Sequence, residues 1–296
     1  MDSTGHCLGI CFAGQQLHYA VNDPSVTNRL LHIGTVDFNF DVVDAISDPE
    51  SSSFDGVRQS LSRLGDHYNA DMVRMLTPAR HECWSVFPRL VYDTNDERED
   101  HLSILMNGTP RRDLESTWFD LSNQDFKLLL VRNRTITSHY RELLQEFNST
   151  EFLSSFELGG EWQHHTQVNG SYLTLDCHGD LVCVASYLLG KLRGATFIRF
   201  ETINDMPYLW AFYGEQLGWM NGFHEQIYIY GPEGRNMADV MAATFKGAGN
   251  NIILNSLDRM NVEADETTYG FKLESAFPAV LLSLNKSDNV SRAAAT

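Results

Sequence analysis

The chain has 296 residues, and 43% of them are hydrophobic, which is enough for about two packed domains. Lys and Arg number 22 against 39 Asp and Glu, so the net charge is −17 at pH 7. A field of that sign repels phosphate backbones and anionic membranes, which argues against nucleic acid as a partner. The best basic patch is expected to be the solvated face of a strand end and the next helix; it consists of Lys127, Arg132, Arg134 and Arg141.

Cysteine usage and hydropathy bear on the compartment. No uncharged apolar stretch approaches the roughly 20 residues that span a bilayer, so we expect no membrane insertion. The first basic residue is Arg29, so the N-terminus lacks the positive region of a secretory signal. Buried, reduced thiols explain an odd number of cysteines better than disulfides do, and we expect a cytoplasmic protein. The five are Cys7, Cys11, Cys83, Cys177 and Cys183.

The first expected element, in chain order, is a β-hairpin over residues 7–21. Apolar residues alternate on both sides of a turn at Gly14, and this alternation is typical of paired strands. Residues 172–186 repeat the plan around a turn at Gly179, 165 positions later. Each hairpin is followed by a third extended run, at 30–40 and at 195–201.

An amphipathic helix is expected after each third run. In the first case serines at 51–53 offer N-caps, and apolar residues recur at helical spacing from 54 to 64, before Gly65. In the second case Asp205 is the expected cap, and a stripe of apolar residues runs from 206 to 217, before Gly218. Short strands at 72–76 and 226–230 follow, and each leads to a small residue and a proline.

Further strand and helix segments complete both halves. They are expected at 126–131 with 135–147, and at 251–254 with 276–284. The repeated order predicts an α/β fold with a duplicated domain, in which each half has a mixed sheet led by a hairpin and flanked by helices. The alternative is two unrelated α/β halves that share a common order. We expect a first half at 1–155, a second half at 156–284 and a flexible tail at 285–296.

Four segments carry a resemblance to a known fold: 8–17, 173–182, 200–217 and 227–231. They resemble the ribonuclease H-like fold shared by actin, sugar kinases and heat-shock chaperone ATPases. More narrowly, the chain looks like an uncharacterised bacterial family with this actin-like ATPase fold. The likeness covers almost the whole chain, but it implies a fold and no established activity.

The resemblance implies a test for nucleotide chemistry. Members that transfer phosphate use two hairpins, each with an aspartate for hydrated Mg²⁺ and glycines that let backbone N–H groups approach phosphate oxygens. The first hairpin has Cys11 in place of the aspartate, and a thiol is a poor ligand for a hard cation. The second keeps Asp176 and Gly179, but His178 stands where a second glycine is wanted. Asp176 is the candidate metal ligand; the alternative is an outward-facing polar residue on a strand.

The adenosine side of such a site normally has paired glycines at a strand end. Here Gly231 and a displaced Gly234 stand in their place, and Pro232 between them has no N–H to donate. An ordinary turn before a helix explains these residues as well. If nucleotide binds, the implied cofactor is Mg-ATP, and the implied binding residues are Gly14, Gln15, Asp176, Gly179, Gly231 and Gly234.

Two classes of function stay open. We favour a non-catalytic protein, a pseudo-ATPase without cofactor, that binds a protein partner or itself, because the first hairpin lacks its carboxylate and fold alone does not certify chemistry. The alternative is an atypical ATP-binding ATPase or phosphotransferase. Trp219 and Phe223, in the loop after Gly218, are the interface candidates, unless their side chains tuck back into the core.

Overall fold

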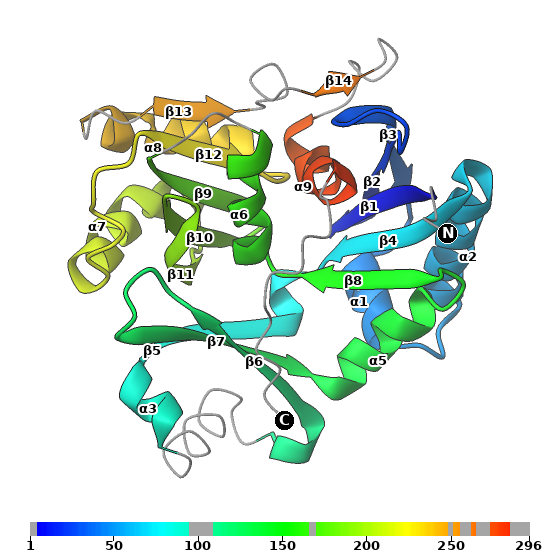
Figure 1. Ribbon diagram of the computed structural model, residues 1–296, viewed down its shortest axis with the longest axis horizontal. Helices are drawn as coiled ribbons and strands as arrows, with labels where there is room; N and C mark the ends of the chain where they lie inside the picture. Colours follow the sequence, from blue (N-terminus) through cyan, green and yellow to red (C-terminus); the bar gives the residue numbers. More distant parts are fainter. Residues whose placement is uncertain are drawn as a thin grey trace.

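The computed structural model describes residues 5–94, 109–165, 170–247, 251–254, 262–264 and 273–284, and their strands form three sheets (Figure 1). The first sheet has the order β14 (Glu263–Ala264), β3 (Arg29–Asp37), β2 (Gln16–Asn22), β1 (His6–Ala13), β4 (Ala70–Leu76), β8 (Ser149–Leu153). The second has the order β11 (Lys191–Arg199), β10 (Leu181–Leu188), β9 (Ser171–His178), β12 (Gln226–Tyr230), β13 (Asn251–Leu254). The third is β5 (Glu82–Pro88), β7 (Phe126–Asn133), β6 (Leu114–Asp120).

Both expected hairpins are confirmed. β1 pairs antiparallel with β2, and β9 with β10. Their turns contain Gly14 and Gly179, with φ of 57° and 56°, where a side chain is strained and glycine is not. In both large sheets the third strand pairs antiparallel with the second, while β4 and β12 pair parallel with β1 and β9. Five strands are therefore arranged alike in the two sheets, as β3-β2-β1-β4-β8 in the first and β11-β10-β9-β12-β13 in the second. The first sheet has β14 as an additional edge strand.

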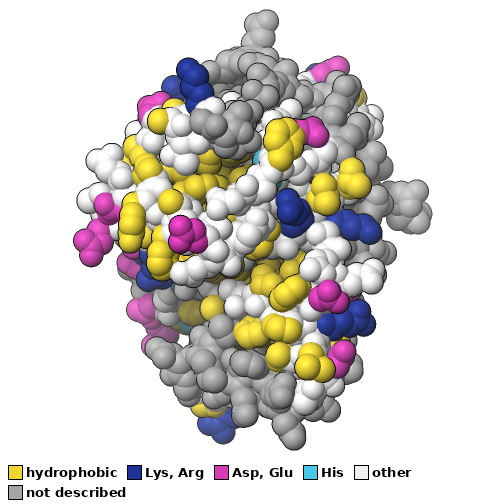
Figure 2. Space-filling view, turned by 90° about the vertical axis from the view of Figure 1, so that its left-hand side faces the viewer, with side chains coloured by type: hydrophobic (Ala, Val, Ile, Leu, Met, Phe, Trp, Pro, Cys, Tyr) yellow, Lys and Arg dark blue, Asp and Glu magenta, His cyan; other side chains and the backbone are white. Residues whose placement is uncertain are grey.

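Helices cover the outer faces of these two sheets. On the first sheet α1 (Val42–Ser47), α2 (Ser52–Tyr68) and α5 (Arg134–Leu143) enclose a core with β1, β2 and β4. On the second, α7 (Met206–Gln216) and α8 (Gly234–Gly247) enclose another with β9, β10 and β12. α7 lies at the left margin of Figure 1, and Figure 2 looks onto that side, where hydrophobic and acidic side chains are neighbours.

The ends of two helices differ from the expectation. The Ser51 hydroxyl caps α2 as predicted, but α2 runs past Gly65 to Tyr68 and ends where Asn69 adopts the left-handed conformation. Gly65 lies inside the helix, where a Cβ would be 2.8 Å from the Phe147 ring. Asp205 does not cap α7 through its side chain. Its carboxylate instead accepts from the backbone N–H of Thr202, in a capping box on the short 3₁₀ helix η3 (Ile203–Asp205).

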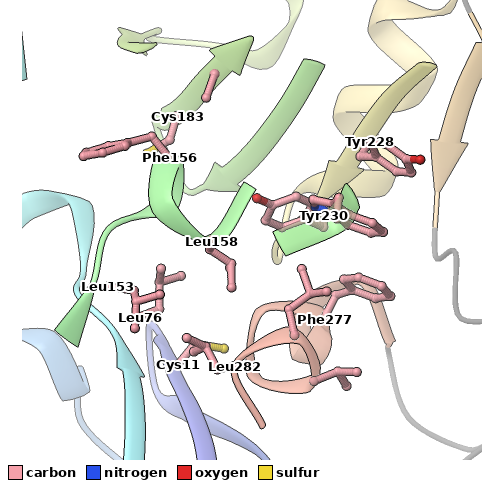
Figure 3. Close-up of a cluster of buried hydrophobic side chains, with 14 of the residues drawn as sticks. Cys11, Leu76, Leu153, Phe156, Leu158, Cys183, Tyr228, Tyr230, Phe277 and Leu282 are labelled. Carbon is pink, nitrogen blue, oxygen red and sulfur yellow. The ribbon is translucent and has the colours of Figure 1, made fainter. Parts of the chain in front are cut away.

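Two helices lie between the large sheets. They are α6 (Ser155–His165) and α9 (Leu273–Leu284); α6 contacts the second sheet, whereas α9 contacts β1, β2, β3 and β4 of the first and β12 of the second. Gly9 of β1 allows this close approach, because a Cβ there would lie 2.1 Å from the carbonyl oxygen of Ala279. Apolar side chains from both sheets and both helices fill the space between them (Figure 3). The centre of the molecule is therefore a packed core.

The strand at 126–131 is not part of either large sheet, which corrects the expected order. It is β7, the middle strand of the third sheet, and the fifth strand of the first sheet is β8. The third sheet also carries α3 (Arg89–Asp93), with 3₁₀ helices η1 (Ala79–His81) and η2 (Arg111–Asp113) before β5 and β6. It packs on the second sheet through Trp84, whose ring stacks on Phe197 with centroids 3.9 Å apart. This sheet is an insertion between β4 and β8.

The four basic residues near β7 do not form an open patch. Lys127 pairs with Asp120, Arg132 with Glu82 and Arg141 with Glu115, while Arg134 donates to the carbonyl oxygen of Leu114. Three of the four charges thus have a carboxylate partner, and the fourth has a backbone acceptor, as expected for a structural face. Within the described ranges no helix is long and apolar enough to span a membrane. The tail at 285–296 lies outside the described residues.

Candidate functional site

The ends of the two hairpins face each other between the large sheets, and Asp176 is the central group. Strand register sets Asp176 of β9 opposite Cys183 of β10 and beside Tyr230 of β12. Cys183 and Tyr230 both belong to the core between the sheets, so Asp176 lies on that inner face. Its exposed fraction is 1%. The alternative of an outward-facing polar residue on a strand is therefore wrong.

His178, two residues further on, is the ionic partner of Asp176. Its Nε2 lies 2.8 Å from Asp176 Oδ1, yet neither carboxylate oxygen has a hydrogen-bond partner with good geometry among the described residues. Burial acts to lower the pKa of His178, but the charge of Asp176 and its close side-chain contact together outweigh burial and leave that pKa above its usual value. The histidine that replaces a glycine in this hairpin thus offsets a buried negative charge.

The first hairpin presents Cys11 and His18 to the second. These two residues are opposite each other in the β1–β2 register. Cys11 is 1% exposed, and its Sγ lies 3.7 Å from the carbonyl oxygen of Ser275 in α9. Burial, and secondly the Asp176 charge, raise the pKa of the Cys11 thiol far above its usual range. A buried thiol with a raised pKa stays neutral, and it is the thiolate that binds metals and acts as a nucleophile.

His18 is also neutral. Burial lowers its pKa to about 4; the Asp37 charge opposes this shift and the His178 charge adds to it. One ring nitrogen, Nδ1, lies 2.8 Å from the Thr35 hydroxyl, and Nε2 is buried without a hydrogen-bond partner among the described residues. Because the charge of His178 in the second hairpin acts on His18 in the first, the ends of the two hairpins are close to each other.

The turn after β12 uses its backbone donors inside the protein. The N–H of Gly231 donates to the carbonyl oxygen of Glu274 at 2.8 Å, that of Glu233 to Cys177 at 3.4 Å, and that of Gly234 to Gly231 at 3.0 Å. Pro232 has no N–H. Gly231 has φ of 95°, and a Cβ there would lie 2.4 Å from the carbonyl oxygen of Cys177. Glycine at this position therefore allows the chain after β12 to approach the backbone of β9 closely.

The Glu274 carbonyl is free to accept because of Pro278. Pro278 lies inside α9, and a helical residue normally donates to the carbonyl four residues earlier, which here is Glu274. Proline cannot donate, so Gly231 supplies the missing hydrogen bond. The proline thereby fixes the turn after β12 to the first turn of α9.

The residues implied for nucleotide binding are divided by the structure. Gly14, Gln15 and Gly179 lie at exposed hairpin turns. Asp176 and Gly231 are buried behind them, and Gly234 begins α8. The described residues contain no group of three or more His, Cys, Asp or Glu side chains placed to hold a metal ion. Their roles toward a nucleotide stay predictions.

The two interface candidates, Trp219 and Phe223, differ in exposure. Trp219 is half-buried on the second core, and a Cβ on Gly194 would lie 2.5 Å from its indole nitrogen. Phe223 is 71% exposed, and its carbonyl oxygen accepts from the Ser171 hydroxyl. Trp219 therefore tucks back, whereas Phe223 does not.

Sequence reasoning missed two contributors to this site. His18 could have been found by counting the hairpin register outward from the Gly14 turn, which sets it opposite Cys11. The Glu274 carbonyl was signalled by a proline inside an apolar helix, which always frees one carbonyl. Only the tertiary structure shows what that carbonyl binds.

The structure can be compared with solved proteins now that its geometry is established. A chain of the PilM–PilN type IV pilus biogenesis complex is similar, with a TM-score of 0.65 and 10% identity over 95% of this chain and 99% of that one. A Bacteroides thetaiotaomicron protein with an actin-like ATPase fold and unknown function has a TM-score of 0.53 and 14% identity, over 86% and 94%. The chain has the actin-like ATPase fold.

A third similar structure is the cytoplasmic domain of EpsL, an inner membrane component of the type II secretion system of Vibrio cholerae. Its TM-score is 0.51 and its identity 10%, over 94% of this chain and 93% of that one. No family model and no curated protein sequence matches the chain. The expected resemblance to actin-like ATPase proteins is thus confirmed at the level of fold, and identities of 10–14% carry no function.

Proposed function

We propose that this protein is a non-catalytic member of the actin-like fold that works by binding another protein or a copy of itself. The observation that carries the proposal is the turn after β12. Its three N–H groups, from Gly231, Glu233 and Gly234, are already bonded to carbonyl oxygens of the protein. A nucleotide that used the same donors would have to break these bonds, and each buried carbonyl oxygen then left without a donor costs about 1–3 kcal/mol.

The hairpins support the same proposal. A Mg²⁺ site wants hard oxygen ligands from both hairpins, and the first offers the buried thiol of Cys11. The second offers Asp176, but His178 lies against its carboxylate. A protonated His178 competes with a cation for the same oxygen atoms. Loss of both features removes the means of holding Mg-ATP, so no cofactor is proposed.

Protein binding is the use that this fold retains without a nucleotide. One similar structure is a complex named for two proteins, PilM and PilN. We carry that mode of action to this chain as a proposal, with either a partner protein or self-association as the outcome. Nucleic acid and membrane insertion are not proposed, since the net charge is −17 and the basic residues near β7 have internal partners.

The shared strand order supports a duplicated architecture. When the third sheet is set aside, β1–β4 and β8 correspond in order to β9–β13. We propose halves at 1–155 and 156–284 that arose by duplication, with α9 of the second half docked on the first sheet. The five cysteines are unpaired, and this supports a reducing, cytoplasmic location.

One observation favours a second candidate, an atypical ATP-binding protein. Both oxygens of Asp176 are buried without a hydrogen-bond partner among the described residues, and such a group can await a ligand. The exposed turn at Gly179 lies three residues beyond it. In that case nucleotide phosphates would lie at the two hairpin turns, and the turn after β12 would have to open.

Titration calorimetry with Mg-ATP separates the two candidates. We expect no heat of binding at protein and nucleotide concentrations that would detect a micromolar dissociation constant. A micromolar constant that is lost in Asp176→Ala and kept in Asp180→Ala would refute the non-catalytic proposal and establish the second candidate. Asp180 is a suitable control because it is an exposed carboxylate in the same turn.

A further inference from the structure

The outer face of α7 carries two large aromatic side chains that the core does not use. Met206, Trp210 and Gly214 are buried and recur every four residues, so they form the inner face of the helix. Tyr208 and Phe212 are four residues apart on the other side, 72% and 45% exposed. Their rings lie 6.5 Å apart at 19° to each other. Two stacked aromatic rings in solvent form an apolar platform.

The chain segment that contains α7 is acidic. From Glu201 to Glu225 there are four acidic residues and no Lys or Arg. However, Arg199 lies just before this segment, and a Cβ on Gly222 would lie 3.2 Å from an Arg193 guanidinium nitrogen. Glu201 and Glu215 are exposed, one just before η3 and the other in the last turn of α7. Figure 2 views this side of the molecule and shows hydrophobic side chains next to acidic ones, with Lys and Arg side chains elsewhere on the same face. An apolar platform within an acidic segment selects a partner that is apolar and basic.

We infer that the outer face of α7 is a docking site for a basic amphipathic segment of a partner protein. The inference rests on the proposed function and names the chemistry of its partner. Leu or Ile side chains of the segment pack on Tyr208 and Phe212, and its Lys or Arg side chains pair with Glu201 and Glu215. The ring faces also accept Lys or Arg through cation–π contacts. A second copy of this acidic chain does not meet that requirement.

The test uses a fluorescent peptide of about 15 residues, roughly four helical turns, made of Leu and Lys. Its counterpart has Glu in place of every Lys. We expect fluorescence anisotropy to show binding of the Leu/Lys peptide and none of the Leu/Glu peptide. Tyr208→Ser/Phe212→Ser weakens binding by 10-fold or more. Because both side chains are exposed, the thermal melt of this variant matches that of the wild type.

A charge-matched pair of variants separates α7 from the general acidity of the chain. Glu201→Gln/Glu215→Gln removes two exposed charges from the segment that carries the platform and weakens binding several-fold, with a smaller dependence on salt. The control Asp66→Asn/Glu146→Gln removes two exposed charges near the end of α2 and after α5 and leaves binding unchanged. Equal binding by all variants would refute the docking site.

Two further outcomes are informative. If sedimentation shows a wild-type dimer that Tyr208→Ser/Phe212→Ser dissociates, the occupant is a second copy and the inference of a basic partner is wrong. The proposed function fails independently, through micromolar Mg-ATP binding, which does not involve α7. Equal peptide binding by all variants together with absent Mg-ATP binding would refute the α7 site alone.

Discussion

Glu82 offers a sharp test of how the burial of a carboxylate affects the pH dependence of this protein's stability. Its carboxylate is fully buried where β5 meets the start of α6, and Oε2 accepts from Arg132 at 3.0 Å and from the Ser154 hydroxyl at 2.9 Å. Oε1 has no hydrogen-bond partner among the described residues. Burial raises the pKa of Glu82 from 4.5 to about 7, although Arg132 and Ser154 act to lower it.

The sign of the pH effect follows from this direction. The folded protein keeps the Glu82 proton up to about pH 7, whereas the unfolded chain releases it near pH 4.5. Glu82 therefore contributes stability that is fully present below pH 4.5 and is lost as the pH rises through 7. Each pH unit in this window is worth about 1.4 kcal/mol, so about 3 kcal/mol is lost in all.

Urea denaturation of wild type and Glu82→Gln at pH 5, 6, 7 and 8 measures this effect. We expect the wild-type advantage in free energy of unfolding to fall by about 1.4 kcal/mol per pH unit up to pH 7 and to level off above it. Glu115→Gln is the control: it removes a partly exposed carboxylate from β6 of the same sheet, and its curve stays parallel to wild type. Parallel curves for Glu82→Gln would refute the assignment of a protonated, buried Glu82.

Three other predictions concern packing and are read by thermal melts or urea denaturation. Gly9→Ala destabilises the protein by about 3 kcal/mol, because the added Cβ meets the backbone of α9. Gly14→Asn, at an open turn, costs under about 1 kcal/mol. Equal costs would contradict the close approach of α9 to β1. Cys11→Asp places a second carboxylate near Asp176 and lowers stability by at least about 3 kcal/mol without creating Mg-ATP binding. The control Cys11→Ser lowers stability less. If Cys11→Asp left stability unchanged, water would have to reach this site. Trp219→Ala lowers stability by about 2 kcal/mol and Phe223→Ala by less than about 0.5 kcal/mol, and the reverse order would show that the loop is wrongly placed.

Local pattern was sufficient for the hairpins and for the helices α2, α5, α7 and α9. Alternation around Gly14 and Gly179 predicts paired strands because a strand exposes its two faces in turn and a tight turn needs a residue that accepts positive φ. The stripe through Met206 and Trp210 predicted the buried face of α7 for a similar reason, with a helical period. The resemblance to the actin-like fold rested on the order of such elements, and that order survives in the two large sheets.

Local sequence patterns could not predict which strands belong to which sheet, nor the contacts between distant residues. The strand at 126–131 has the sequence of a buried strand, and nothing in that pattern says whether it pairs with β4 or with β5. β8 was missed because only one of its five residues is buried, so its apolar signal is weak. The packing of Trp219 likewise depends on Gly194, 25 positions earlier in the chain, where the absence of a side chain leaves room for the indole.

Asp176 shows most clearly what the sequence determined and what the tertiary structure decided. The sequence determined that a carboxylate stands at the end of a strand before a turn. It also determined that Cys11 and His178 occupy positions where nucleotide-binding proteins of this fold have other residues. The tertiary structure decided that this carboxylate points inward, since only the packing of one sheet against the other makes one face of β9 a core face. Burial of a charge is a property of the surroundings, and those surroundings come from α9 and β1, which lie far from Asp176 in sequence.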